Sequence, residues 1–259
     1  MGRVHNLMTR RRFYAPPGAI DAKASTATLS GDEARHLRDV LRLTPGDEVF
    51  LFDGMGREYR CSINEIGRAS STLNVIEVVE AASPESPLKL TLAVALLKGE
   101  KFDFVVQKAT ELGVTQIVPV KTARADIRLR DSADAGKRVA RWQRIALEAA
   151  KQCGRAFVPR VADPTEFRKL ISDPELVAGQ RFMFSERGGQ PFSVSENTRQ
   201  PVESVIALTG SEGGWTDEEI EAARETGWQI VTLGGRILRA ETAAIAVSAL
   251  LQHRFGDLH

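Results

Sequence analysis

Two glycine-rich segments near the C-terminal end of the sequence carry residue types suited to ligand binding. The first, residues 208–214, reads LTGSEGG and follows the apolar run 204–208; the second, residues 233–242, reads LGGRILRAET and follows the run 228–233. Glycines let a backbone approach a ligand closely, and open α/β sheets bind ligands at the carboxyl ends of their strands. Each glycine pair alone is typical of a tight turn, but two such segments with charged residues favour a binding site.

The sequence lacks the other common signatures of nucleotide and metal chemistry. It contains no G-x-x-x-x-G-K-[ST] loop, and its only G-x-G, Gly54-Met55-Gly56, falls in a predicted hairpin and not at a helix start. The four histidines and two cysteines have no metal-ligand spacing, so no metal site is expected. Cys153 lies in a helical pattern and is more typical of a small core residue than of a nucleophile.

The elements that would position these segments alternate between strand and helix over residues 88–259. Asp163-Pro164 predicts the start of a helix, and Thr216 with Glu219 forms a capping box for a helix that extends through Arg224. Such alternation is typical of a parallel sheet with helices on both faces. The predicted strands are 88–97, 116–120, 204–208 and 228–233, and the other predicted helices are 101–113, 133–154 and 240–254.

Residues 1–80 show a different pattern, with short apolar runs between turn signals. Asp53-Gly54 between two such runs predicts a β-hairpin, and one short helix is expected around residues 32–41. The pattern predicts a small β-barrel domain. Residues 81–87, with two prolines among small polar residues, read as a linker, which leaves 88–259 as a second domain.

Charge is unevenly distributed along a chain whose net charge is only +1. Residues 121–160 hold 11 basic and four acidic side chains, whereas residues 161–259 hold nine and 15. A basic stripe of this density suits RNA phosphates, although a solvated helix face explains the charge alone equally well. No apolar run reaches the length of a membrane span and the basic N-terminus lacks a signal-peptide core, which predicts a cytoplasmic protein with no membrane partner.

Several segments together resemble the RsmE family of 16S ribosomal RNA methyltransferases. They are LGGRILRAETA, GSEGG, HRFGD, RRFYAPP, KGEKFDFVVQKATELGVTQIVPV and RWQRIALEAAKQCGR, and the similarity extends over essentially the whole chain. The resemblance implies a SPOUT-class α/β domain with a C-terminal trefoil knot, preceded by a PUA-like β-barrel. It further implies S-adenosyl-L-methionine as the cofactor, N3-methyluridine as the product, 16S rRNA or the small ribosomal subunit as the partner, and a homodimer.

The resemblance also implies roles for individual residues. Arg124 and Arg239 are candidates for contact with uracil or phosphate, and Glu212 is either a general base or a structural acceptor, with water an equal alternative as the base. The cofactor is expected on Leu208, Thr209, Gly210, Glu212, Gly213, Gly214, Leu233, Gly234, Ile237, Leu238 and Thr242. RNA is expected on Arg10, Arg11, Arg12, Phe13 and Arg155, because cations beside a ring can grip phosphate and stack on bases.

Three positions depart from the family's usual residues. Ser211 and Gly235 stand where the family has proline, and Ala240 replaces a common threonine. Loss of two prolines predicts loops that are less ordered before the cofactor binds. The substitution Gly213→Val is predicted to abolish cofactor binding while the fold survives. Two alternative functions remain open at this point, a ribose 2′-O-methyltransferase of the same class and a non-catalytic RNA-binding factor.

Overall fold

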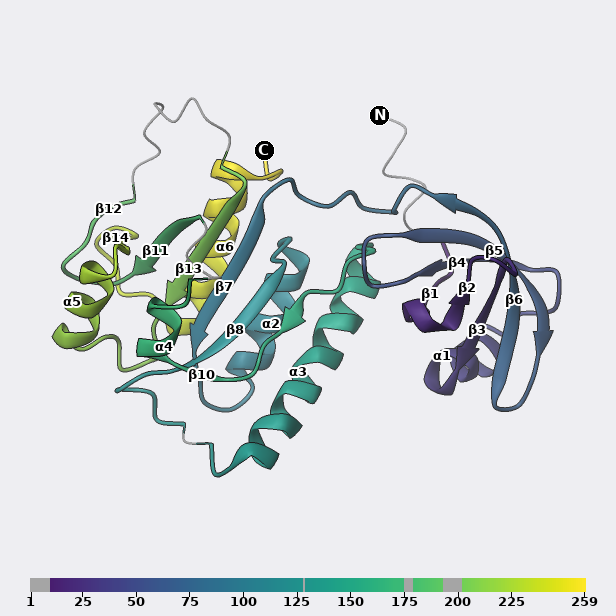
Figure 1. Cartoon of the computed structure of the whole chain (residues 1–259), viewed down its shortest axis with the longest axis horizontal. Helices are drawn as coiled ribbons and strands as arrows, with labels where there is room; N and C mark the ends of the chain where they lie inside the picture. The colour runs from purple at the N-terminus through teal and green to yellow at the C-terminus, as the bar shows by residue number, and fades with distance from the viewer. Residues whose placement is uncertain (1–9, 128, 175–178, 193–201) are drawn as a thin grey trace. The chain divides into compact units, whose positions relative to one another are not determined.

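The computed structural model describes residues 10–127, 129–174, 179–192 and 202–259, which group into two compact units (Figure 1). Unit 1 contains the chain up to Glu85 together with Ala150–Val158, and unit 2 contains Ser86–Ala149 and Pro159–His259. Within this described part of the chain, no helix combines the length and apolar character that crossing a bilayer requires.

Unit 1 is built on a curled six-stranded sheet in the order β1-β4-β5-β6-β3-β2. Strand β1 runs parallel to β4, and the other neighbouring strands are antiparallel. The predicted hairpin joins β4 to β5, where Asp53 Oδ1 accepts hydrogen bonds from the Met55 and Arg57 backbone N–H groups at 2.7 and 3.1 Å. The strands are β1 (Arg12–Tyr14), β2 (Ile20–Asp21), β3 (Thr26–Ser30), β4 (Glu48–Phe52), β5 (Glu58–Ile66) and β6 (Ser70–Val79).

One short helical segment packs against this sheet, as the sequence predicts. Helix α1 (Gly31–Arg35) continues directly into a π-helical turn over His36–Val40. Leu37 on that turn is fully buried together with alternate residues of the strands, such as Leu29, Leu51 and Leu73. Period-two burial of apolar side chains gives unit 1 its own core.

Unit 2 contains a parallel sheet in the order β10-β8-β7-β13-β11-β14-β12, with β9 paired to β8. The predicted mixed α/β architecture is therefore confirmed, while the knot stays a prediction. The strands are β7 (Lys89–Ala95), β8 (Gln116–Lys121), β9 (Arg160–Val161), β10 (Thr165–Glu166), β11 (Gln180–Phe184), β12 (Gln190–Pro191), β13 (Ser204–Thr209) and β14 (Gln229–Thr232). The helices are α2 (Lys101–Glu111), α3 (Ser132–Cys153), α4 (Phe167–Ile171), α5 (Asp217–Glu225) and α6 (Ala240–Phe255).

Several elements of unit 2 differ from the sequence-based expectation, and the short strands β9, β10 and β12 are among them. Strand β11 was not predicted, because its five residues include only three buried ones and give no periodic signal. The helix expected from Asp163 begins instead at Phe167, since Thr165 and Glu166 pair with β8 as strand β10. The capping box of α5 is confirmed, and Thr216 Oγ1 accepts the Glu219 N–H at 3.1 Å.

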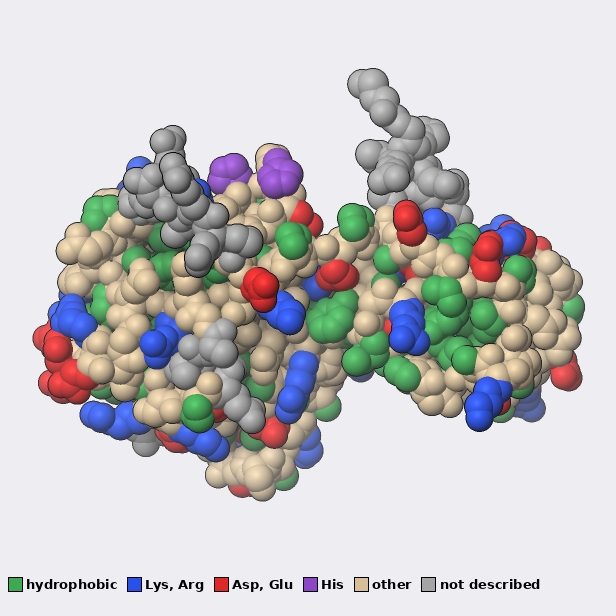
Figure 2. Space-filling model, turned by 45° about the horizontal axis from the view of Figure 1, so that its top comes forward, with side chains coloured by type: hydrophobic (Ala, Val, Ile, Leu, Met, Phe, Trp, Pro, Cys, Tyr) green, Lys and Arg blue, Asp and Glu red, His purple; other side chains and the backbone are tan. Residues whose placement is uncertain are grey.

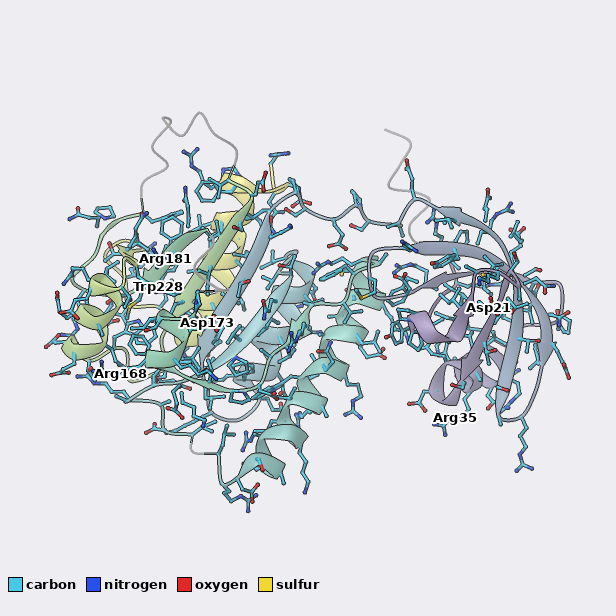
Figure 3. All side chains as sticks on the ribbon, viewed as in Figure 1. Asp21, Arg35, Arg168, Asp173, Arg181 and Trp228 are labelled. Atoms are coloured by element: carbon cyan, nitrogen blue, oxygen red, sulfur yellow. The ribbon has the colours of Figure 1, made fainter. Side chains whose placement is uncertain are left out.

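Two buried tryptophans anchor the part of unit 2 that lies around the C-terminal strands. The Trp228 indole N–H, labelled in Figure 3, donates to the carbonyl of Ile171 at 3.2 Å. The Trp215 indole N–H donates to the carbonyl of Phe184 at 2.9 Å. This second bond joins the segment after β13 to the end of β11 and so fixes the spacing of two loops that surround a cavity.

Candidate active site

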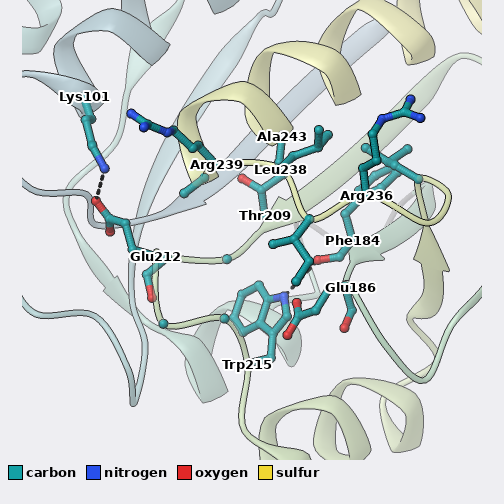
Figure 4. A pocket seen from close by; sticks show the side chains of 18 of the residues that line it. Lys101, Phe184, Glu186, Thr209, Glu212, Trp215, Arg236, Leu238, Arg239 and Ala243 are labelled. Carbon is teal, nitrogen blue, oxygen red and sulfur yellow. Dashed lines mark hydrogen bonds and ion pairs between the residues drawn. The ribbon is translucent and has the colours of Figure 1, made fainter.

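A cavity of about 450 Å³ opens at the carboxyl ends of β11, β13 and β14 (Figure 4). Its size is within the range of small-molecule sites, roughly 300–1,000 Å³. The lining comes from the ends of three parallel strands and the first turns of α2 and α6. These lining residues are Lys101, Phe184, Ser185, Glu186, Thr209, Gly210, Ser211, Glu212, Gly213, Gly214, Trp215, Leu233, Gly234, Arg236, Ile237, Leu238, Arg239, Ala240 and Ala243.

Both glycine-rich segments of the sequence meet at this one cavity. Strand β11 lies between β13 and β14 in the sheet, so its end separates the two segments and contributes a wall of its own. Of the residues expected to bind the cofactor, Leu208 is fully buried in the core and Thr242 is exposed on α6, and neither lines the cavity. The other expected residues line it: Thr209, Gly210, Glu212, Gly213, Gly214, Leu233, Gly234, Ile237 and Leu238.

An ion pair closes one side of the cavity. Lys101 Nζ lies 2.9 Å from Glu212 Oε1 and 3.6 Å from Glu241 Oε2, and Figure 4 shows Arg239 on the same side of the view. Partial burial acts to raise the pKa of Glu212, but the hydrogen bond from Lys101 and backbone hydrogen bonds outweigh it, so the pKa lies below its ordinary value. The hydrogen bond with Glu212 raises the pKa of Lys101. Glu212 is therefore engaged by Lys101, and its lowered pKa makes it a weaker base, which favours the structural role over that of a general base.

Arg124 supports the first glycine-rich segment without lining the cavity. Its Nη1 donates to the carbonyl of Gly213 at 3.3 Å, and a Cβ on Gly213 would lie only 2.8 Å from both Cβ and the carbonyl oxygen of Arg124. A valine at 213 would therefore collide with the Arg124 backbone and displace the loop. Packing against Arg124 therefore already requires glycine at position 213, and the predicted loss of cofactor binding in Gly213→Val stays a prediction.

The cavity contains residues that sequence reasoning missed. Lys101 is far in sequence from both glycine-rich segments. Phe184 is the last residue of β11, the strand that was not predicted, and Ser185 and Glu186 follow it. Arg236 and Arg239 are both exposed, and neither has an acidic partner among the described residues. Two uncompensated guanidinium groups beside a cavity of this size suit a ligand that carries negative charge.

Comparison with known proteins identifies the family. A family profile described as an RNA methyltransferase domain matches residues 84–252, and one described as an RNA methyltransferase PUA domain matches residues 29–76. The ribosomal RNA small subunit methyltransferase E of Synechocystis sp. is 37% identical over 255 residues, 95% of this chain and 79% of that protein. The chain belongs to the ribosomal RNA small subunit methyltransferase E family.

Other members of the methyltransferase E family agree in sequence and in fold. The Bacillus subtilis protein is 34% identical and covers 88% of this chain and 90% of its own. The crystal structure of the Neisseria gonorrhoeae member bound to S-adenosyl methionine matches with a TM-score of 0.84 and 34% identity, covering 96% of this chain and 100% of that chain. The resemblance inferred from the sequence is thus confirmed, together with the PUA-like and α/β fold class.

Most of the residues expected to bind RNA in this methyltransferase E homologue are engaged inside unit 1. Phe13 is 0% exposed in the sheet core, so its ring packs the fold and cannot stack on a base. The Arg12 side chain is 6% exposed, and its Nη2 lies 3.0 Å from Glu58. Arg155 pairs with Glu85 at 2.7 Å. Arg10 also pairs with Glu58 at 2.9 Å, whereas Arg11 is exposed. The burial of Phe13 leaves its ring unavailable to a base, and the RNA contacts of the arginines stay a prediction.

The basic stripe is also largely compensated in three dimensions. On the face seen in Figure 2, Lys and Arg side chains are interspersed with Asp and Glu side chains. Lys137 and Arg144 of α3 are exposed and have no acidic partner within the described ranges, whereas Arg128 lies outside them. The stripe residues with an acidic partner within 4.0 Å include Lys121, Arg130, Arg138, Arg141, Lys151 and Arg155.

Proposed function

We propose that this protein transfers a methyl group from S-adenosyl-L-methionine to N3 of a uridine in 16S rRNA of the small ribosomal subunit. The observation that carries the proposal is the convergence of both glycine-rich segments on one cavity at the carboxyl ends of parallel strands. Two relatives with the same fold, from Neisseria gonorrhoeae and Legionella pneumophila, bind S-adenosyl methionine in their crystal structures.

The residues that line the cavity fit this cofactor. Gly234 has φ +94°, and an added Cβ on Gly234 or Gly235 would meet no atom within 4 Å, so the backbone there faces open space. Aromatic and aliphatic side chains, including Trp215 and Leu238, supply apolar walls beside polar groups. A cavity with open backbone, apolar walls and charged groups of both signs suits a nucleoside that carries a compact charged tail.

The cofactor would supply a methyl group on a cationic sulfur, and transfer to N3 would break the methyl–sulfur bond and release the neutral thioether S-adenosylhomocysteine. In the proposed mechanism, residues 209–214 and 233–238 hold it so that the methyl group faces the entering uracil, because in-line attack requires near-contact geometry. Arg239, exposed at the rim and without an acidic partner among the described residues, stabilises the anion that develops on the uracil ring. Glu212 orders its loop through Lys101, Arg124 supports Gly213, and water accepts the N3 proton.

The proposed RNA contacts of each unit are the basic residues that remain uncompensated in it. Arg11 in unit 1 and Lys137 and Arg144 in unit 2 are exposed and have no acidic side chain within 4.0 Å among the described residues. Such groups release counterions when they contact phosphate. A homodimer in the cytoplasm, in which two-fold symmetry presents two copies of each surface to one rRNA, completes the proposal.

Primer extension on rRNA tests the assignment to N3. Methylation at N3 blocks the base-pairing edge, so reverse transcriptase is expected to stop at one uridine of 16S rRNA in the parent strain and to read through it in a strain that lacks this protein. Complementation with the wild-type chain should restore the stop, and complementation with Arg239→Ala should not. Read-through in every strain would overturn the assignment, and a stop that appears only at low nucleotide concentration would indicate ribose 2′-O-methylation instead.

Calorimetry separates an enzyme from a non-catalytic RNA-binding factor. The purified wild-type chain is expected to bind S-adenosylmethionine with a dissociation constant in the micromolar range, on the order of 8 kcal/mol of binding free energy. No heat of binding at millimolar cofactor, in a sample whose unfolding transition is cooperative, would favour the binding factor.

A further inference from the structure

The cavity holds two carboxylates that differ in their partners. Glu212 accepts a hydrogen bond from Lys101 Nζ at 2.9 Å, so its charge is compensated. Among the described residues, Glu186 has one cation within 4.0 Å, Arg187, whose Nε is 3.8 Å from Oε1. That guanidinium donates its hydrogen bonds elsewhere, to Asp217 at 2.6 Å and to the Trp215 carbonyl at 2.7 Å. Glu186 therefore keeps more free acceptor capacity than Glu212 does.

Glu186 lies just beyond the end of a strand, where its carboxylate lines the cavity. It lies two residues beyond the end of β11, the strand between the two that carry the glycine-rich segments. A Cβ on Gly214 would approach Glu186 Oε1 to 2.9 Å, so the carboxylate rests against the backbone of the first glycine-rich segment. Figure 4 shows Glu186 beside Trp215, on a different side of the cavity from Lys101 and Glu212.

This arrangement has the parts of a ribose site. In dinucleotide-binding Rossmann folds, a glycine-rich turn after one strand binds the phosphates of the nucleotide, and an acidic side chain further along the chain accepts a hydrogen bond from a ribose hydroxyl. A carboxylate suits a vicinal diol because its two oxygens accept two donors in one plane. In this chain, the glycine-rich turn follows β13 and the acidic side chain follows β11.

We propose that Glu186 accepts hydrogen bonds from the ribose hydroxyls of the nucleoside bound in the cavity. The inference rests on the proposed function, because it takes that nucleoside to be the adenosine part of the cofactor. It gives the two carboxylates separate tasks. Glu212 orders the loop that covers one side of the cavity, and Glu186 selects a ribonucleoside.

Ligand pairs test this assignment by calorimetry. Glu186→Gln keeps the shape of the side chain but loses the charge and one acceptor, so affinity is expected to fall about tenfold. The fall should be equal for S-adenosylmethionine and S-adenosylhomocysteine, because both carry the same ribose. The matched control is Glu225→Gln, an exposed carboxylate on α5 outside the cavity, which should bind both ligands as the wild type does.

A deoxy ligand distinguishes hydrogen bonding from a general structural effect. Removing the 2′-hydroxyl of S-adenosylhomocysteine should weaken binding to the wild type about tenfold and should weaken binding to Glu186→Gln hardly at all, because the acceptor is already impaired. Equal losses in both proteins would overturn the proposal. So would unchanged affinity in Glu186→Gln, or a loss confined to S-adenosylmethionine, which would place the carboxylate at the sulfonium. Failure of the wild type to bind either ligand would instead refute the proposed function.

Discussion

Arginines in unit 1 and arginines at the cavity of unit 2 have opposite environments. Arg10 and Arg12 share the carboxylate of Glu58, which is fully buried, and their guanidinium groups stack over Phe50 and Phe52 at 4.7 and 4.8 Å. Arg239 at the cavity is exposed, as is Arg236, and both lack an acidic partner within the described chain. The same residue type therefore stabilises the fold in one unit and remains available to a ligand in the other.

The cluster around Glu58 joins segments that are far apart in sequence but belong to the same unit. Its carboxylate also accepts the backbone N–H of Ala82 at 3.0 Å, and Arg12 donates to the carbonyls of Lys151 and Arg155 at 3.2 and 3.0 Å. The Glu58 carboxylate and the Arg12 guanidinium thus hold together strand β1, the segment after β6 and the end of α3. A buried charge with several committed donors is costly to remove, because the remaining charge is left without compensation.

Glu58→Gln should give the largest effect of any change considered. It keeps the side-chain volume but leaves Arg12 buried without a counter-charge, so the free energy of unfolding should fall by about 3–5 kcal/mol. Urea titration followed by circular dichroism measures this change. Affinity for S-adenosylmethionine, measured on the folded variant, should stay within about twofold of the wild type, because the cavity belongs to the other unit.

An exposed ion pair in the same sheet provides the control. Glu77 pairs with Arg60 at 2.9 Å, and its side chain is 53% exposed. Glu77→Gln should therefore cost less than about 1 kcal/mol. If both variants lost the same free energy of unfolding, the burial of Glu58 would not explain its contribution to stability. The proposed difference between the buried arginines of unit 1 and the exposed arginines of unit 2 would then be wrong.

Arg239→Ala should leave stability nearly unchanged but lower activity, the opposite of Glu58→Gln. The guanidinium is exposed and has no acidic partner within the described ranges, so the free energy of unfolding should stay within about 0.5 kcal/mol of the wild-type value. The methylation rate should fall about 100-fold, since an electrostatic donor to a developing anion is lost. Single-turnover transfer to rRNA measures the rate, with Arg168→Ala on the exposed side of α4 as the control. A stability loss without a rate loss would assign Arg239 to the fold.

Features with a local sequence signal could be predicted, whereas contacts between distant segments could not. The apolar runs of β7 and β13 and both glycine-rich segments were predicted because their signals are local. Glu186 and Lys101 were missed because only the sheet order and the position of α2 bring them to the cavity. Arg12 was assigned to RNA because nothing in the sequence indicates that Glu58, 46 positions away, is its partner. The sequence shows that residue 12 is an arginine, but only the tertiary structure shows that its partner is Glu58.

Lys101→Met tests whether the one compensated carboxylate of the cavity acts by ordering its loop. The pKa of Glu212 is lowered, so the ionised pair forms above the ordinary glutamate pKa and is lost as pH falls through the lowered value. Without Lys101 the raising effect of burial remains, and Glu212 should protonate at a higher pH. Affinity for S-adenosylmethionine should fall by no more than about fivefold at neutral pH.

A pH titration of cofactor affinity checks this expectation. In Lys101→Met, the acid limb of the profile should move toward higher pH relative to the wild type. The matched variant Lys108→Met removes a lysine that pairs with Glu111 on the same helix and does not line the cavity, and it should leave the limb in place. If the acid limb of the affinity profile stayed at the same pH in Lys101→Met, Glu212 would not influence cofactor binding.

Gly235→Pro should give the smallest effect and the only gain. No backbone hydrogen bond from the Gly235 N–H is found among the described residues, and an added Cβ would meet no atom within 4 Å, so proline removes neither a bond nor space. Fewer unbound conformations should raise cofactor affinity about threefold, measured by calorimetry. Gly235→Ala restricts the backbone less and should give a smaller gain. In unit 1, buried ion pairs order the chain, whereas the cavity loops have few such contacts, so restricting the backbone is a further way to order them. Weaker binding in Gly235→Pro would mean that the loop must move to admit its ligand, and the openness of the cavity would then be part of its function.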